Sequence, residues 1–407
     1  MRFRKWLTIS VVLVILLTSC SSKGDHFEKQ SGSLKVAYLY QNGFMPQYGN
    51  LLKGKFPNVD IEIVEIPFEA YRNPTELNTF VNTYQPDILV AYNYQTFTYF
   101  MEQQLLTNLQ SLTKGDFDPA DFHPQLLPLW KDGTALMGVS PYFKLEGIIY
   151  NTELFQKYQI TLPSESITWN ELLVTASLFP QEDDIIGLEV LEENDPFAFV
   201  RYLGEKAGLQ WISNDGKQLT IDSPSWMDVF QVAATAYQNG ILRLDAAPAQ
   251  KEQSKIAMSR DTIGSLRQIE NGWGAIPLPA VAGSNNYNDV AFVDIFGINA
   301  NSPNIELAWE IIKYITGEEW AAQKQNADGY ISTRTKYIGQ VGGVDVEQVL
   351  NNIAFVNAQS QVTSDFTQKF SQFVRQAFLQ IIENNRPVEE VIQELKSEGQ
   401  LLLETLP

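Results

Sequence analysis

Cysteine and histidine are almost absent from this chain. Cys20 is the only cysteine in 407 residues, and His26 and His123 are the only histidines. A single cysteine cannot form an intramolecular disulfide, and it cannot build a metal site alone. A nucleophilic cysteine needs an activating neighbour, and neither histidine lies in a recognisable cysteine-protease context. The role that remains for Cys20 is attachment.

Basic residues are scarce too, with 29 Lys and Arg against 48 Asp and Glu, for a formal net charge of −19. Nucleic-acid binding needs a basic footprint, so we expect no nucleic-acid partner. The chain has no G-x-x-x-x-G-K-[ST], G-x-G-x-x-G, G-x-S-x-G or H-E-x-x-H motif. We therefore expect no cofactor, no metal and no enzyme activity. Paired catalytic carboxylates need not be close in sequence, so a lipid-anchored hydrolase remains the least favoured alternative.

A hydrophobic run long enough to span a bilayer is also missing. Residues 6–18 are uncharged and mostly apolar, and as a helix they would be about 20 Å long against a bilayer core of ~30 Å. The run follows Arg2, Arg4 and Lys5, which is the pattern of a secretory signal peptide. Residues 17–20, LTSC, resemble the bacterial lipobox, in which the cysteine is diacylated and becomes the first mature residue.

This resemblance implies a lipoprotein signal peptide over residues 1–19 and a lipid-anchored chain that starts at Cys20. Two acyl chains give stable anchoring where one is marginal. Residues 20–33 are polar and small, as in a flexible tether. We expect the protein on the extracytoplasmic face of the cell membrane, held there by the lipid.

After the tether, short apolar strands alternate with helical segments. Residues 34–40, 59–66 and 86–92 are typical of strands, and residues 74–84 form a helix with Pro74 in its first turn. This alternation predicts a parallel sheet with helices on its faces. Ligands of such sheets bind beyond the carboxyl ends of the strands. The candidate ligand-binding residues at these ends are Tyr40, Asn42, Tyr92 and Tyr94.

Helix-capping patterns mark the middle and the end of the chain. Thr168 and Glu171 have the spacing of a capping box. Ser223-Pro224 and Ser302-Pro303 are typical helix starts. An apolar stripe at helical spacing predicts a core-facing helix near the C-terminus; it consists of Phe366, Phe370, Phe373, Ala377 and Ile381.

Several segments, taken in order, resemble the family 1 extracellular solute-binding proteins of ABC importers, the group that includes the maltodextrin-binding proteins. Residues 133–163 resemble the family segment that leaves one lobe and continues as an apolar strand ending in Tyr-Asn, here Tyr150-Asn151. Thr168-Trp169 follows as it does in the family. The other matching segments are residues 86–92, 105–114, 255–266, 273–283 and 296–323.

The resemblance implies an α/β fold of two lobes (type II periplasmic-binding-protein-like), with two parallel-type sheets joined by crossing hinge strands. The N-terminal lobe would hold residues 34–141 and 292–340, and the C-terminal lobe residues 142–291 and 341–407. The hinge would lie near residues 141–144 and 290–292. The implied partners are a small solute and the membrane subunits of an ABC importer, with the receptor a monomer.

In this architecture a solute is captured between the lobes by hinge closure. A carbohydrate is the favoured ligand, because aromatic residues make up 12% of the chain and flat rings suit the apolar faces of sugars. A peptide or a polyamine is the alternative. Further ligand-binding candidates lie near the crossings or match a family segment: Tyr142, Phe197, Trp273 and Asp294.

Overall fold

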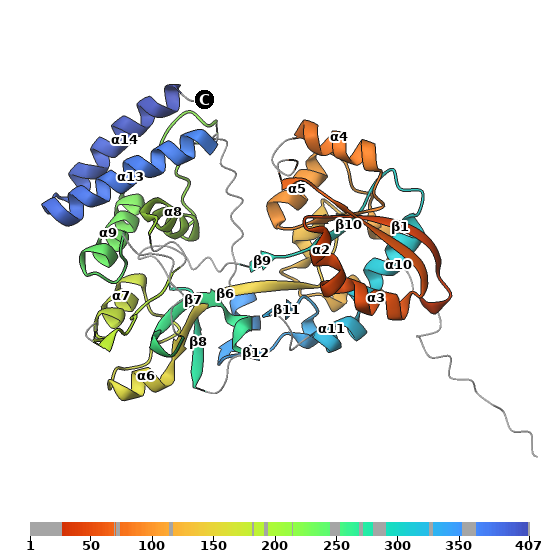
Figure 1. Ribbon diagram of the computed structural model, residues 1–407, viewed down its shortest axis with the longest axis horizontal. Coiled ribbons are helices and arrows are strands. Elements are labelled where there is room, and N and C mark those ends of the chain that lie inside the picture. The colour runs from red at the N-terminus through yellow and green to blue at the C-terminus, as the bar shows by residue number, and fades with distance from the viewer. Residues whose placement is uncertain are drawn as a thin grey trace, which may run out of the picture.

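The computed structural model describes residues 27–68, 70, 74–113, 117–180, 183–190, 194–213, 215–244, 253–267, 272–279, 290–324, 329–351 and 364–405. The predicted signal peptide, Cys20 and most of the predicted tether lie outside these residues. The described chain forms two lobes, and the long strand β6 (Tyr142–Asn151) runs from one to the other (Figure 1).

The N-terminal lobe is built on a four-stranded sheet in the order β10-β3-β1-β2. β1 (Ser31–Tyr38) pairs in parallel with β2 (Asn58–Glu65) and with β3 (Ile88–Ala91), which confirms the predicted parallel arrangement. β10 (Ile295–Ile298) returns late in the chain and pairs antiparallel with β3. All residues of β3 and β10 are buried, as expected for strands covered on both faces.

Helices cover this sheet. α2 (Gln41–Phe44), a π-helix (Met45–Gly49) and α3 (Asn50–Lys55) follow one another directly, so the π turn accommodates Pro46 without ending the helical run. The sheet is also accompanied by α4 (Pro74–Tyr84), α5 (Tyr94–Glu102), α10 (Ile305–Ile315) and α11 (Glu318–Lys324).

The second sheet is centred on β6 and differs from the predicted parallel type. β7 (Met258–Thr262), β8 (Trp273–Pro277), β9 (Val290–Phe292) and β11 (Ile331–Ser332) all pair antiparallel with β6. Among the described residues around this second sheet, two isolated bridges are parallel, and both lie at or beside β7: Ile186 with Ile256 and Glu189 with Ser259. The sheet is antiparallel because β6 runs from the N-terminal to the C-terminal lobe, and the four strands beside it run in the opposite direction.

Four helices of the C-terminal lobe begin with a side-chain cap. The predicted capping box is confirmed: Thr168 accepts from the Glu171 amide at 3.3 Å, and Glu171 accepts from the Thr168 amide at 2.8 Å. Asn151, Asp195 and Ser223 cap three other helices. The helices are α6 (Thr152–Lys157), α7 (Trp169–Ser177), α8 (Pro196–Lys206), α9 (Pro224–Gln238), α13 (Ser364–Asn384) and α14 (Val388–Thr405).

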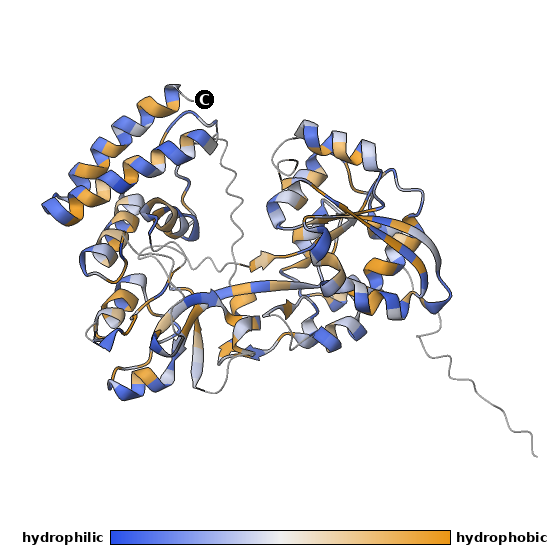
Figure 2. Cartoon of the chain, in the orientation of Figure 1, coloured by the Kyte–Doolittle hydropathy of each residue, from blue (hydrophilic) through white to orange (hydrophobic). Residues whose placement is uncertain are grey.

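Hydrophilic and hydrophobic residues alternate along α13 and α14 (Figure 2), as expected for helices with one face on a core. On α13 the predicted stripe is confirmed, with Phe366, Phe370, Ala377 and Ile381 buried and Phe373 partly buried against the same core. No helix in the described part of the chain is long and apolar enough to cross a membrane.

The buried apolar side chains form two clusters: one fills the N-terminal lobe and continues along β6 to Ile149, Ile263 and Ala275, and the other fills the helical part of the C-terminal lobe. Val341, Val344 and Leu350 belong to the first of these clusters, where it lies against β8. They come from β12 (Gln340–Val341), β13 (Val344–Asp345) and α12 (Val346–Asn351), and the Ala275 amide donates to the Gly342 carbonyl at 3.0 Å. β4 (Lys131–Asp132) and β5 (Ala135–Leu136) are two-residue strands that pair with each other.

Candidate functional site

Aromatic side chains gather at the carboxyl edge of the N-terminal sheet. Tyr40 follows β1 and is 63% exposed, and Phe68 follows β2 and is 42% exposed. Tyr92 follows β3, and its ring lies 6.2 Å from the ring of Phe68. Because β1, β2 and β3 are parallel, their carboxyl ends meet at one edge. Exposed rings that gather at one edge suit a ligand with apolar faces.

Polar groups accompany these rings. Asn42 lies exposed in the short helix α2, two residues after Tyr40. The backbone amide of Gln41 donates to Oε2 of Glu65, the last residue of β2, at 3.1 Å. Tyr94 begins α5 and is half-buried, and its ring lies 6.4 Å from Phe292 of β9. The edge therefore adjoins the second crossing segment.

Asp294, the residue two positions after β9, is the centre of a buried hydrogen-bond network. Its Oδ2 accepts from the hydroxyls of Tyr48 at 2.8 Å, Tyr38 at 2.9 Å and Tyr142 at 3.3 Å. The Gln47 amide donates to the Tyr142 hydroxyl, which also contacts the Tyr48 hydroxyl. Asp294 has φ +64°, a left-handed conformation that Asp tolerates better than most residues.

Burial dominates the electrostatics of this network. It raises the pKa of the Asp294 carboxyl above its ordinary value of 3.8, and the hydroxyls of Tyr48, Tyr38 and Tyr142 oppose this shift by stabilising the ionised form. Burial, followed by the nearby Asp294, raises the pKa of Tyr48 and of Tyr142 well above 10.0. The tyrosines are therefore neutral donors that hold a carboxylate in a poorly solvated place.

Tyr142 and Asp294, both predicted to contact ligand, are thus brought together with each other. Tyr142 is 4% exposed and Asp294 is 3% exposed, so they join the two crossing segments rather than present a surface. Tyr38 and Tyr48 could not be placed beside them from the sequence, since Tyr48 is 246 positions from Asp294.

The structure does not bring Phe197 or Trp273 to this region. Phe197 is 4% exposed in the core of the C-terminal lobe, with its ring centroid 5.0 Å from Trp211 and 5.2 Å from Phe370. Trp273 pairs with Asn151 at the far end of β6. At about 3.3 Å per residue, that end lies roughly 30 Å from Tyr142. Packing and distance therefore separate both residues from the aromatic edge.

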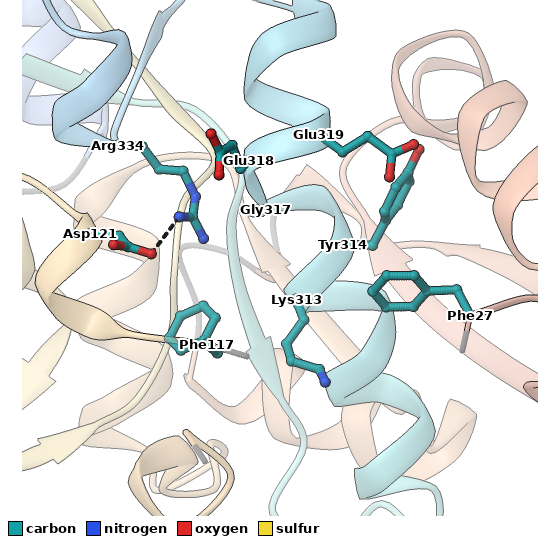
Figure 3. Close-up of a pocket in the computed structure, with 9 residues that line it drawn as sticks. All are labelled: Phe27, Phe117, Asp121, Lys313, Tyr314, Gly317, Glu318, Glu319 and Arg334. Carbon is teal, nitrogen blue, oxygen red and sulfur yellow. Dashed lines mark hydrogen bonds and ion pairs between the residues drawn. The ribbon is translucent and has the colours of Figure 1, made fainter. Parts of the chain in front are cut away.

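A cavity of about 350 Å³ lies where α10 meets α11 (Figure 3). Its charged groups are largely paired: Asp121 with Arg334 at 2.9 Å and Glu319 with Lys55 at 2.8 Å. Burial, followed by Glu319, raises the pKa of Tyr314 to about 12. All lining residues belong to the N-terminal lobe or precede it, so the cavity is distinct from a site between lobes; they are Phe27, Phe117, Asp121, Lys313, Tyr314, Gly317, Glu318, Glu319 and Arg334.

Within the described residues, no group of three or more His, Cys, Asp or Glu side chains could hold a metal ion. His123 is buried, its Nδ1 accepts from the Gln125 amide at 3.3 Å, and burial lowers its pKa from 6.5.

Two lobes, a carboxyl edge that carries exposed rings and paired crossing segments define the class of two-domain binding proteins with the type II periplasmic fold. The sequence pattern of the bacterial extracellular solute-binding protein family matches residues 40–322, more than half of the chain. The chain therefore belongs to this family of solute-binding receptors.

Solved structures share the fold at low sequence identity. An ABC substrate-binding protein from Listeria monocytogenes, in complex with cycloalternan, is 16% identical with a TM-score of 0.66, over 92% of this chain and 100% of that one. The GacH receptor of Streptomyces glaucescens, solved with acarbose, is 16% identical with a TM-score of 0.64, over 93% and 100%. The sugar-binding protein MalE from Xanthomonas citri is 14% identical with a TM-score of 0.66, over 92% and 98%. No curated protein matches the sequence.

Proposed function

We propose that this protein is the receptor of an ABC importer that captures a carbohydrate between its two lobes. The observation that carries the proposal is the aromatic carboxyl edge, formed by Tyr40, Phe68 and Tyr92 with Asn42 beside it. A sugar offers C–H faces to such rings and hydroxyls to such amides. Three similarly folded proteins are named with cycloalternan, acarbose or sugar as their ligand, which agrees with this choice.

In the proposed mechanism the receptor binds the solute between its lobes and does not change it chemically. A solute on the aromatic edge of the N-terminal lobe gains a second set of contacts only when the C-terminal lobe closes over it. Because only the closed state makes both sets, the solute shifts the equilibrium toward closure. The closed receptor then docks on the membrane subunits of the importer, and no bond in the solute is broken.

The N-terminus completes the proposal. Diacylation at Cys20 would tether the receptor to the outer face of the membrane through the polar residues that follow. Mass spectrometry of protein from its native membrane tests this point directly. A mature chain that begins at residue 20 and carries a diacylglyceryl group is the expected result, and an unmodified residue 20 would refute it.

A thermal-shift screen over monosaccharides and oligosaccharides, followed by calorimetry, tests the ligand class. A solute at 100 times its Kd stabilises the native state by about 2.7 kcal/mol, a clear increase in Tm. We expect at least one neutral saccharide to produce it. Peptides or polyamines that stabilise the protein while every saccharide fails would reverse the assignment.

A further inference from the structure

The face of β6 that links the two cores carries two charged residues at its middle. Side chains alternate along a strand, so Tyr142, Lys144, Glu146 and Ile148 share one face. Tyr142 belongs to the core of the N-terminal lobe and Ile148 to the core of the C-terminal lobe. Lys144 and Glu146 therefore lie on the stretch of strand between the cores, and both are only half-buried.

The partner strands leave room above these two residues. β6 exchanges partners here, since residues 142–145 pair with β9 and β11 and residues 146–151 pair with β7 and β8. Directly opposite residues of an antiparallel pair share a face. The residue opposite Lys144 is the exposed Ala291, and the residue opposite Glu146 is the half-buried Thr262. Small neighbours do not cover the two charges.

Aromatic rings hold each charged group in place. The Lys144 ammonium lies 5.1 Å from the ring centroid of Tyr330, and that ring stacks on Tyr142 at 4.3 Å. Glu146 accepts from the Tyr202 hydroxyl at 3.4 Å and lies 3.9 Å from the ammonium of Lys206. Side chains fixed in this way lose little conformational entropy when a ligand arrives.

The charged groups around this stretch are of both signs, and they include Arg260, which lies opposite Ile148 with its guanidinium 3.8 Å from the ring centroid of Tyr202. Glu146 pairs with Lys206, while Lys144 lies close enough to Asp294 to lower its pKa slightly against the larger effect of burial. Because both signs are present, a solute with net charge of either sign would meet groups of its own sign here, and this disfavours charged solutes. Hydroxyl groups suit this stretch well, since they donate to a carboxylate and accept from an ammonium in strong charge-assisted hydrogen bonds.

We infer that Lys144 and Glu146 are specificity-determining residues that bind the hydroxyls of a neutral saccharide at the crossing strand. This inference rests on the proposed function. It adds two residues of β6 to the site and specifies that the solute is uncharged. In this arrangement the aromatic edge packs on the apolar faces of the sugar, while Lys144 and Glu146 form hydrogen bonds with its hydroxyl groups.

Calorimetry on single variants of the full mature chain tests this, with the neutral saccharide from the screen as the probe. We expect Lys144→Gln and Glu146→Gln each to raise Kd at least tenfold while Tm of the unliganded protein stays within a few degrees. Lys144→Arg, which keeps the charge, should recover part of the loss. The matched controls are Lys157→Gln, whose ammonium lies 4.6 Å from the Tyr158 ring on the outer helix α6, and Glu62→Gln on β2, which is exposed.

The outcomes separate the inference from the function beneath it. Wild-type binding of a neutral saccharide, with unchanged Kd in folded Lys144→Gln and Glu146→Gln, would overturn the inference and leave the function standing. Tighter binding of an acidic oligosaccharide or a polyamine than of any neutral saccharide would overturn the neutral solute. Failure of every saccharide on the wild-type protein would contradict the proposed function itself.

Discussion

The hydroxyl of Tyr142 donates to Oδ2 of Asp294 at 3.3 Å, and this contact joins the two segments that cross between the lobes. Tyr142 begins β6, and Asp294 follows β9, which pairs with β6 over residues 143–145. With Tyr38 and Tyr48 donating to the same oxygen, the start of the first crossing and the end of the second are fixed to the N-terminal lobe.

Tyr142→Phe should therefore weaken the native state. The change removes one donor from a buried carboxylate and leaves the Gln47 amide without this acceptor, at a cost of about 1–2 kcal/mol. Thermal and denaturant unfolding measure the change. Tyr150→Phe, further along the same strand in the C-terminal lobe, is the control and should cost less. Equal losses in the two variants would contradict the role of the network.

Asp294→Asn should change how stability depends on pH. Because burial raises the pKa of Asp294, the native state keeps its proton at pH values where the unfolded chain has lost it. The free energy of unfolding contributed by this group therefore falls as pH rises from 3.8 through the native pKa. Asn does not titrate, so the difference between wild type and variant should change with pH in that window and become constant above it.

Denaturant unfolding at a series of pH values measures this difference. Asp60→Asn, which alters an exposed carboxylate on β2, is the control. A wild-type minus Asp294→Asn difference that stays flat through the window, or that grows with rising pH, would mean that the native pKa is not raised.

Tyr40→Ala should weaken saccharide binding without affecting the fold. Tyr40 is 63% exposed at the carboxyl edge of the sheet, so its ring contributes little to the core and is free to pack on a sugar. We expect Kd to rise at least tenfold, about 1.4 kcal/mol. Tyr84→Ala removes a ring that is 49% exposed just before β3, at the opposite edge, and should leave Kd unchanged. Calorimetry that finds equal effects would remove Tyr40 from the site.

Gly204→Ala should destabilise the C-terminal lobe. A Cβ at Gly204 of α8 would lie 2.1 Å from the Trp226 ring, which is 2% exposed and held by a 3.0 Å hydrogen bond from its Nε1 to the Gln210 carbonyl. Overpacking of this kind costs about 1–3 kcal/mol. Gly54→Ala on α3 meets nothing within 4 Å, so it should leave Tm unchanged or slightly higher. A Gly204→Ala protein as stable as wild type would contradict the packing described here.

Local patterns predicted the elements well because their causes are local. The capping box at Thr168 and the stripe on α13 follow from residues close in sequence, and the parallel pairing of β1 with β2 and β3 follows from the alternation of strands and helices in the first lobe. The direction of strands beside β6 does not, because periodicity records which side chains are buried and not which strands meet. The antiparallel second sheet was therefore missed.

The candidate site was predicted only in part for a similar reason. The carboxyl edge is a property of parallel strands, so Tyr40 and Tyr92 could be nominated from their positions. Phe197 was nominated because its segment resembles a family segment that brings an aromatic residue to the sugar, but Trp211 and Phe370 cover its ring in this lobe. Phe68 could have been found as an aromatic residue just after a predicted strand end. Lys144 and Glu146 could not be nominated from the sequence, because their position between the two cores is known only once the core residues of both lobes are known.

Small-angle X-ray scattering of the mature protein, with and without the saccharide identified by calorimetry, tests the central claim most directly. The account predicts a smaller radius of gyration in the liganded protein, because the two lobes close on the solute. Tight saccharide binding with an unchanged scattering curve would show that the solute is held on one lobe, and it would contradict capture between the two.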